Sequence, residues 1–372
     1  MKNLKHTRRI AGAAIIALSM TLAACGSDNP TGTESGNKSA EGGSSAPAEL
    51  SGTLAGAGAS SQKAAIAAWK AGFEQEQKGA KVEYDPVGSG SGVKKFLAKE
   101  VSFAGSDEVL KEKDQAAAEE RCGSPALHIP VYISPIAVVF NLDGVEKLNL
   151  SAPVIAKIFA GKITKWNDPA IAAENAGVAL PDLDITPVHR ADGSGTTYNF
   201  TQWMHAAAPE DWTNEANKKW PLEGTNGEKT QGVVDLVKNG KGSIGYVDDS
   251  AAGTLGIVQV KGSGDQYVAP NAEGAAKTLD ESELAGKSDL DLAFKINRTP
   301  KAADAYPLIL VSYDVVCSTY PDDNTAKLVK AFVSYETSEA GQNAAAQAAK
   351  SAPLSANLRE KIAKSLDSIK VK

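Results

Sequence analysis

Three short segments rich in glycine and hydroxyl side chains recur along the chain, each between a strand-like and a helix-like stretch. They read LAGAGASSQ (54–62), VGSGSGVKK (87–95) and RADGSGTTY (190–198). Glycine lets a ligand approach the backbone, and the first turn of a helix presents free N–H groups at the positive end of the helix dipole. Serine and threonine are also ordinary N-caps, so one such turn alone indicates only a capped helix. Three of them, one carrying Arg190, favour an anion-binding site.

Better-known phosphate and nucleophile motifs do not fit these turns. A P-loop requires lysine directly after its last glycine, but here Val93 separates Gly92 from Lys94. A nucleophile elbow requires a central serine, but the centre of GSGSG is Gly90. The histidines show no ligand spacing with cysteine or carboxylate, so we predict neither a metal nor a cofactor.

The rest of the chain alternates between strand-like and helix-like stretches, which is an α/β pattern. Ile66, Trp69 and Phe73 recur at helical spacing, and the region after residue 324 reads as helices. Segments rich in β-branched and aromatic residues predict strands at 81–87, 127–142, 184–190, 243–247 and 306–316.

The N-terminus reads as an export signal. Residues 1–24 begin with a basic stretch and continue with an apolar run too short to span a bilayer. The run ends in LAAC, which resembles a lipobox and predicts lipidation of Cys25, although a plain signal peptide is the alternative. Residues 26–49 contain no aromatic and no large aliphatic side chain, so we expect residues 25–50 to form a flexible linker.

Charge and cysteine usage fit an exported protein that does not bind nucleic acid. Removing the four basic residues of the signal changes the formal net charge from −6 to −10. An acidic surface argues against nucleic acid and means that local donors must hold any bound anion. Cys122 and Cys317 are candidates for a disulfide in an oxidising compartment, and two buried thiols are the alternative.

Asp107 bears on the identity of the anion. It ends the apolar stretch VSFAGSD (101–107), and an acid in that position is often a solvated turn residue. A carboxylate that instead faced the anion-binding turns would repel a bare anion. A hydrogen phosphate has an O–H to donate to it, whereas sulfate at neutral pH has none and would leave the acid unpaired.

These residues resemble a known family. LAGAGAS, VGSGSGVKKF, FAGSD and above all HRADGSGTT, in this order, look like the phosphate-binding (PstS-type) subunit of bacterial phosphate-import ABC transporters. The resemblance implies a two-lobed, type II periplasmic-binding-protein-like α/β fold with two hinge crossovers and a ligand cleft. It assigns 51–138 and 306–372 to lobe one and 139–305 to lobe two.

The resemblance also implies site residues. Asp107 is the expected proton acceptor, and Asp192 is expected to orient Arg190. The family's first turn commonly ends in threonine and phenylalanine, where this chain has Ser60 and Ser61, so Ser61 is expected to offer only its backbone N–H. The phosphate-binding residues implied are Ser60, Ser61, Ser89, Asp107, Arg190, Ser194, Gly195 and Thr196.

The resulting hypothesis is a monomeric lipoprotein, anchored on the outer face of the cell membrane, that delivers inorganic phosphate to the permease and ATPase subunits of an ABC transporter. It is not an enzyme. Two alternatives remain open at this point. A secreted phosphoryl-transfer enzyme would need a metal cluster or an activated nucleophile, and a binding protein for an unprotonated oxyanion should lack Asp107.

Overall fold

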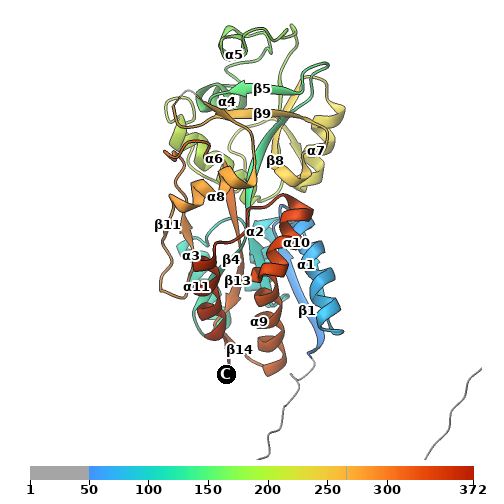
Figure 1. Ribbon diagram of the computed structural model, residues 1–372, viewed down its shortest axis with the longest axis vertical. Helices are drawn as coiled ribbons and strands as arrows, with labels where there is room; N and C mark the ends of the chain where they lie inside the picture. Colours follow the sequence, from blue (N-terminus) through green and yellow to red (C-terminus); the bar gives the residue numbers. More distant parts are fainter. Residues whose placement is uncertain (1–49, 265) are drawn as a thin grey trace, which may run out of the picture. The chain divides into compact units, whose positions relative to one another are not determined.

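A mixed β-sheet connects the two halves of the structure. The computed structural model describes residues 50–264 and 266–372, so the predicted signal, the linker up to residue 49 and Cys25 lie outside the described residues. Eight strands follow one another in the order β2-β1-β3-β13-β4-β8-β6-β7, and three more join through β9. This is a two-lobed α/β architecture, as the sequence predicted (Figure 1).

Lobe one is built on parallel strands near the N-terminus. β1 (Ser51–Gly58) lies between β2 (Gly79–Asp85) and β3 (Phe103–Ser106), parallel to both. β13 (Ile309–Cys317) returns from late in the chain and pairs antiparallel with β3. Lobe one therefore combines the beginning and the end of the described chain.

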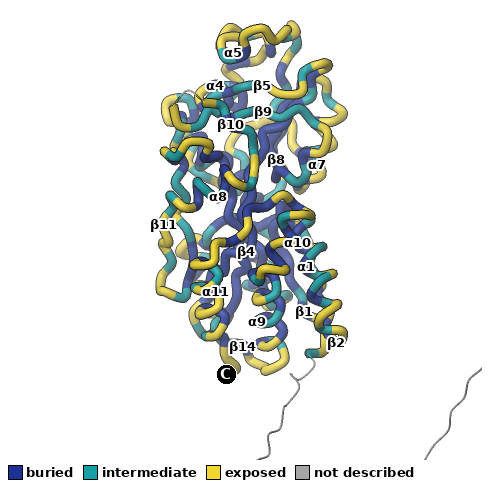
Figure 2. Tube along the Cα trace, in the orientation of Figure 1, coloured by how far each residue is buried: buried dark blue, intermediate teal, exposed yellow. Residues whose placement is uncertain are grey.

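β4 (Ala126–Phe140) is shared by both lobes, and all fifteen of its residues are buried (Figure 2). Its first part, as far as Pro135, pairs antiparallel with β13. Its last part, from Ile136, pairs antiparallel with β8 of lobe two. A continuous apolar run of this kind predicts a strand covered on both faces, and the expectation of a strand at 127–142 is confirmed.

Lobe two continues the sheet beyond β4. The predicted strands at 184–190 and 243–247 are confirmed as β6 (Thr186–Arg190) and β8 (Ser243–Asp248), which pair in parallel. The remaining strands of this lobe's sheet are β5 (Lys147–Leu150), β7 (Thr225–Gly227), β9 (Gly256–Lys261) and β10 (Tyr267–Val268).

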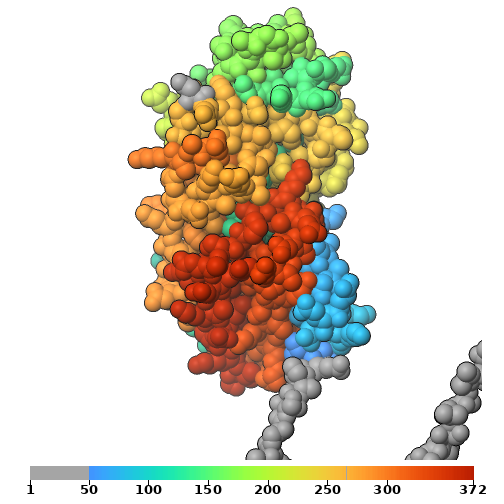
Figure 3. Space-filling view, viewed as in Figure 1, coloured from blue at the N-terminus to red at the C-terminus, as the bar shows by residue number. Residues whose placement is uncertain are grey.

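Helices cover the sheet in each lobe. In lobe one, Ile66, Trp69 and Phe73 of α1 are buried as their spacing predicted, and the Trp69 indole donates to the Gly341 carbonyl at 2.8 Å. The helices of lobe one are α1 (Lys63–Glu76), α2 (Ser89–Leu97), α3 (Glu112–Cys122), α9 (Asp323–Thr337), α10 (Glu339–Ala349) and α11 (Ala356–Asp367), the last three forming the red surface in Figure 3. The helices between β4 and β13 in the sequence are α4 (Ala152–Phe159), α5 (Pro169–Glu174), α6 (Gly195–Ala207), α7 (Lys229–Asn239) and α8 (Ala272–Asp280).

One stretch within the range expected for lobe two packs on strands of lobe one. Short strands β11 (Glu283–Leu284) and β12 (Phe294–Lys295) flank it. The carboxylate of Asp291 accepts hydrogen bonds from the backbone N–H and the ring of His128 on β4, at 2.8 and 2.7 Å. The Tyr313 hydroxyl of β13 accepts the backbone N–H of Phe294 at 3.0 Å.

A disulfide joins Cys122, at the end of α3, to Cys317, at the end of β13, with 5.5 Å between their Cα atoms. The bridge fastens a helix from early in the chain to the strand that returns after lobe two. Within residues 50–264 and 266–372, every helix is too short or too polar to cross a lipid bilayer.

Candidate anion-binding site

The three glycine and hydroxyl turns each begin a helix, as predicted, and they meet near the end of β3. α1, α2 and α6 follow the first, second and third turn. The Gly90 N–H of the second turn donates to the Gly193 carbonyl of the third at 2.9 Å, which joins lobe one to lobe two. The helix N-termini of both lobes therefore converge on one place.

Asp107 lies at this convergence and is 3% exposed. The Ser61 hydroxyl donates to its two carboxylate oxygens at 2.8 and 2.9 Å, and Ser312 of β13 donates at 2.5 Å. Thr196 of lobe two donates at 3.4 Å. Within residues 50–264 and 266–372, the side chains that donate to this acid are all neutral hydroxyls.

Burial raises the pKa of Asp107, because a carboxylate loses hydration in the interior. The hydroxyls of Ser312 and Ser61 and the positive charge of Arg190 act in the opposite direction and lower that pKa. These groups stabilise the ionised acid without a direct ion pair. When it is ionised, Asp107 can accept one more hydrogen bond, for example from an O–H group.

Gly195 brings the third turn against Asp107 and Ser89. A Cβ at this position would lie 2.5 Å from the Asp107 Cβ and 2.6 Å from the Ser89 hydroxyl oxygen, closer than real contacts allow. Ser89 itself is the first residue of α2, and its hydroxyl accepts the backbone N–H of Asp107 at 3.2 Å. Glycine is therefore required for the two lobes to approach here.

Arg190 is 3% exposed and is held by Asp192. The guanidinium donates through Nε and Nη2 to the two carboxylate oxygens, at 2.7 and 2.5 Å, in a bidentate pair that fixes its plane. Asp192 also accepts the backbone N–H of Lys229 at 3.0 Å. Gly88 of lobe one lies so close that a Cβ there would be 2.2 Å from the Asp192 carboxylate.

The other two predicted hydroxyl residues, Ser194 and Ser60, are also buried. Ser194 is the N-cap of α6, and its oxygen accepts the Thr197 N–H at 3.1 Å. The Ser60 hydroxyl lies 2.9 Å from the Thr230 hydroxyl, at the start of α7, and accepts the Thr230 N–H at 3.3 Å. Ser60 and Thr230 therefore form a second contact between the lobes.

Three residues of the site escaped prediction: Ser312, Thr230 and Asn199. The Asn199 amide donates to the backbone carbonyls of Asp107, at 2.6 Å, and of Gly195, at 2.9 Å. Thr230 follows a glycine-containing stretch and begins a helix, which is the same signal that identified the other turns. Ser312 and Asn199 lie inside a strand and a helix, where no local pattern distinguishes them.

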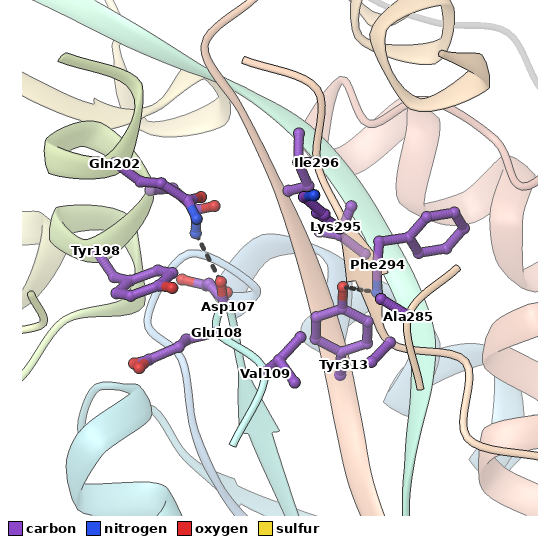
Figure 4. Close-up of a pocket in the computed structure, with 13 residues that line it drawn as sticks. Asp107, Glu108, Val109, Tyr198, Gln202, Ala285, Phe294, Lys295, Ile296 and Tyr313 are labelled. Atoms are coloured by element: carbon purple, nitrogen blue, oxygen red, sulfur yellow. Dashed lines mark hydrogen bonds between the residues drawn. The ribbon is translucent and has the colours of Figure 1, made fainter. Parts of the chain in front are cut away.

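A cavity of about 210 Å³ borders the Asp107 end of this cluster (Figure 4). Tyr198 and Gln202 of α6 form one wall, and Phe294 and Tyr313 form the opposite wall. In the part of the chain that the structure describes, no group of three or more His, Cys, Asp or Glu side chains is arranged to hold a metal ion.

The neutral donors, the oriented guanidinium and the buried acid Asp107 together suit a small tetrahedral anion that carries a proton. Comparison with known proteins agrees with this geometry. A family model described as a PBP superfamily domain matches residues 43–340. The chain is 38% identical over 341 residues to "Phosphate-binding protein PstS 3" of Mycobacterium leprae, covering 89% of this chain and 91% of the relative. It is 37% identical over 344 residues to the protein of that name from Mycobacterium tuberculosis strain H37Rv, with the same coverage of both.

The chain belongs to the PBP superfamily and, within it, to the family of PstS-type phosphate-binding proteins. Solved structures share its fold. A phosphate-binding protein from Stenotrophomonas maltophilia aligns with a TM-score of 0.65 at 20% identity, covering 84% of this chain and 94% of that one. A human phosphate-binding apolipoprotein aligns with a TM-score of 0.64 at 20% identity, covering 83% and 93%.

Proposed function

We propose that this protein captures inorganic phosphate between its two lobes and delivers it to an ABC-type import permease, without catalysing a reaction. The observation that carries the proposal is the buried carboxylate of Asp107, set among neutral hydroxyl donors beside one oriented arginine. The curated relatives are named phosphate-binding proteins and cover most of the chain.

In the proposed complex, the phosphate lies at the convergence of the three helix N-termini. Backbone N–H groups and hydroxyls donate to its oxygens, and Arg190 supplies the positive charge. Asp107 accepts the phosphate O–H. The Ser61 hydroxyl donates to Asp107, and its backbone N–H donates to the phosphate, as the sequence suggested. The proposed ligands are Ser60, Ser61, Ser89, Asp107, Arg190, Ser194, Gly195 and Thr196.

Selectivity follows from the same acid. Sulfate at neutral pH has no proton, so it would set a negative oxygen against the ionised Asp107 in a site closed to water. A charged group left unpaired in such a site costs about 1–3 kcal/mol or more, or roughly 10- to 100-fold in affinity. Arsenate keeps the proton and the tetrahedral shape and should therefore be accepted.

Binding is proposed to stabilise the contacts between the lobes. Gly90 with Gly193, and Ser60 with Thr230, already join the lobes around the site. A ligand that touches both sides stabilises this arrangement over one in which the lobes are separated, since only here are all its contacts made. The proposal assigns 51–138 and 306–372 to lobe one and 139–305 to lobe two.

Location and partners complete the proposal. A signal at residues 1–24 and lipidation of Cys25 would hold the protein on the outer face of the cell membrane, with residues 25–50 as a flexible tether. From there, a monomer would present phosphate to the permease, which the ATPase subunits drive. The family is one of solute-binding proteins, which supports a transport role over an enzymatic one.

Titration calorimetry on the full chain, purified in detergent, tests the proposal. The ligands are phosphate, arsenate and sulfate at pH 7.5, with protein stripped of bound anion by unfolding and refolding. We expect phosphate and arsenate to bind at one site per chain and sulfate not to compete. Binding of sulfate as tight as that of phosphate, or no phosphate binding at all, would refute the proposal.

A further inference from the structure

A second acid, Glu108, lies directly beside Asp107 and is also 3% exposed. Its backbone is fixed, because the Ser106 hydroxyl donates to the Glu108 carbonyl at 2.7 Å and accepts the Glu108 N–H at 3.3 Å. Among the residues described, no hydroxyl and no backbone N–H donates to its carboxylate oxygens. Two neighbouring buried acids at a site for an anion require compensation from elsewhere.

The closest compensating charge comes from the opposite lobe, and Lys111 of lobe one adds a weaker one. The Lys218 ammonium lies 3.2 Å from the Glu108 carboxylate and 3.8 Å from that of Asp114. The Lys218 side chain is 19% exposed, whereas that of Glu108 is 2% exposed. Lys218 belongs to the segment between α6 and β7, so the ion pair crosses from lobe two to lobe one.

Lys218 is also tied to the third turn of the anion site. Its backbone carbonyl accepts the N–H of Ser194 at 3.0 Å. The preceding residue, Asn217, donates its N–H to the Thr201 hydroxyl of α6 at 3.1 Å. The lysine is therefore fixed to the same helix whose N-terminus faces Asp107, and it moves with that helix.

The ion pair acts differently on the two arrangements of the lobes. With the lobes together, Glu108 lies beside Tyr198 of α6 at the edge of the cavity (Figure 4) and is 3% exposed, so Lys218 compensates much of its charge. With the lobes apart, both groups would be hydrated and would need no partner. Removing Lys218 alone therefore penalises the closed arrangement, since it leaves a buried charge uncompensated.

On this basis, and resting on the function proposed above, we propose that Lys218 is a positioning residue that sets phosphate affinity by neutralising Glu108 across the lobe interface. It lets an anion bind beside two adjacent acids. It does not touch the phosphate, so it controls how long the lobes stay closed. Discrimination between anions is left to Asp107.

The test is a double-mutant cycle of Lys218→Met and Glu108→Gln in the full chain, with Lys219→Met as the matched control. Lys219 is the neighbouring exposed lysine, so its loss changes the net charge equally. We expect Lys218→Met to weaken phosphate binding roughly 10- to 100-fold, mostly through faster dissociation, as is typical of removing one partner of a buried charge pair. Lys219→Met should bind as the wild type does.

Adding Glu108→Gln to Lys218→Met should restore most of the lost affinity, because the uncompensated charge is then gone. Lys218→Arg keeps the charge and should bind phosphate with nearly wild-type affinity. It serves as a control for misfolding caused by substitution at this position. Wild-type affinity in Lys218→Met, or a double variant as weak as Lys218→Met, would overturn the inference. A wild type that binds no phosphate would instead refute the proposed function.

Discussion

The hydroxyl of Ser61 donates hydrogen bonds to both carboxylate oxygens of Asp107, at 2.8 and 2.9 Å. From the sequence we expected Ser61 to offer the ligand only its backbone N–H. Its side chain instead belongs to the support of the acid, together with Ser312. The acid proposed to accept the phosphate proton is thus held in place by neutral donors, which leave its charge intact.

Asp107→Asn should reduce discrimination between phosphate and sulfate. The amide no longer repels a bare oxyanion and offers an N–H donor in place of one acceptor. We expect phosphate affinity to fall roughly 10-fold or more and the phosphate-to-sulfate ratio to fall further. Parallel calorimetric titrations measure this, with Asp289→Asn, an exposed acid, as control. An unchanged ratio would show that Asp107 does not select the ligand.

Gly195→Ala should abolish tight binding, because the added Cβ would collide with Asp107 and Ser89. Overpacking of this kind costs about 1–3 kcal/mol and here opposes closure of the lobes. Gly193→Ala is a close control, since its Cβ would meet only Gly90, at 3.6 Å. Calorimetry should show a much weaker complex for the first variant and little change for the second. Equal affinities would mean that the lobes need not approach at Gly195.

Much of this arrangement could be predicted because its signals are local. Glycine and hydroxyl residues punctuate strand-to-helix turns, so the starts of α1, α2 and α6 were predicted. The partners of the site depend on long-range packing. Ser312 meets Asp107 from 205 residues away, and Thr230 meets Ser60 from 170 residues away. No local sequence pattern indicates such long-range pairs. The ion pair between Lys218 and Glu108 across the lobe interface is also a long-range contact.

Loss of the Cys122–Cys317 bridge should destabilise the fold and leave the site intact. The bridge closes a loop with a sequence separation of 195 residues, and removing such a cross-link typically costs about 2–5 kcal/mol. Denaturant unfolding of the double serine variant should show that loss. Phosphate affinity should stay within about twofold, since Ser312 lies five residues before Cys317 on β13. A large loss of affinity in folded protein would contradict this separation.

Stability should fall as the pH rises through neutrality, because of Asp314 and Glu336. Both acids are fully buried, and burial raises the pKa of Asp314 to about 7 and that of Glu336 well above its ordinary value. The native state thus holds protons that the unfolded chain has released, so its free energy of unfolding decreases with pH between the ordinary and the raised pKa values.

Glu336→Gln removes one of the two buried acids and should flatten this dependence. Denaturant unfolding at pH 5.5, 7 and 8.5 checks it, with the exposed Glu360→Gln as control. A residual slope is expected from Asp248, whose pKa burial also raises to about 7. An equal slope in wild type and Glu336→Gln would show that Glu336 does not hold a proton in the native state near neutral pH.

The antiparallel pairing of β13 with β3 and β4 determines when lobe one can be completed during synthesis. The ribosome makes β3 and β4 early, but their partner and the covering helices α9–α11 emerge only after all of lobe two. Lobe one therefore cannot complete its core until the chain from β13 onward, Ile309 to Lys372, has been made. If the chain is exported as proposed above, such delayed completion would favour its crossing the membrane before lobe one folds.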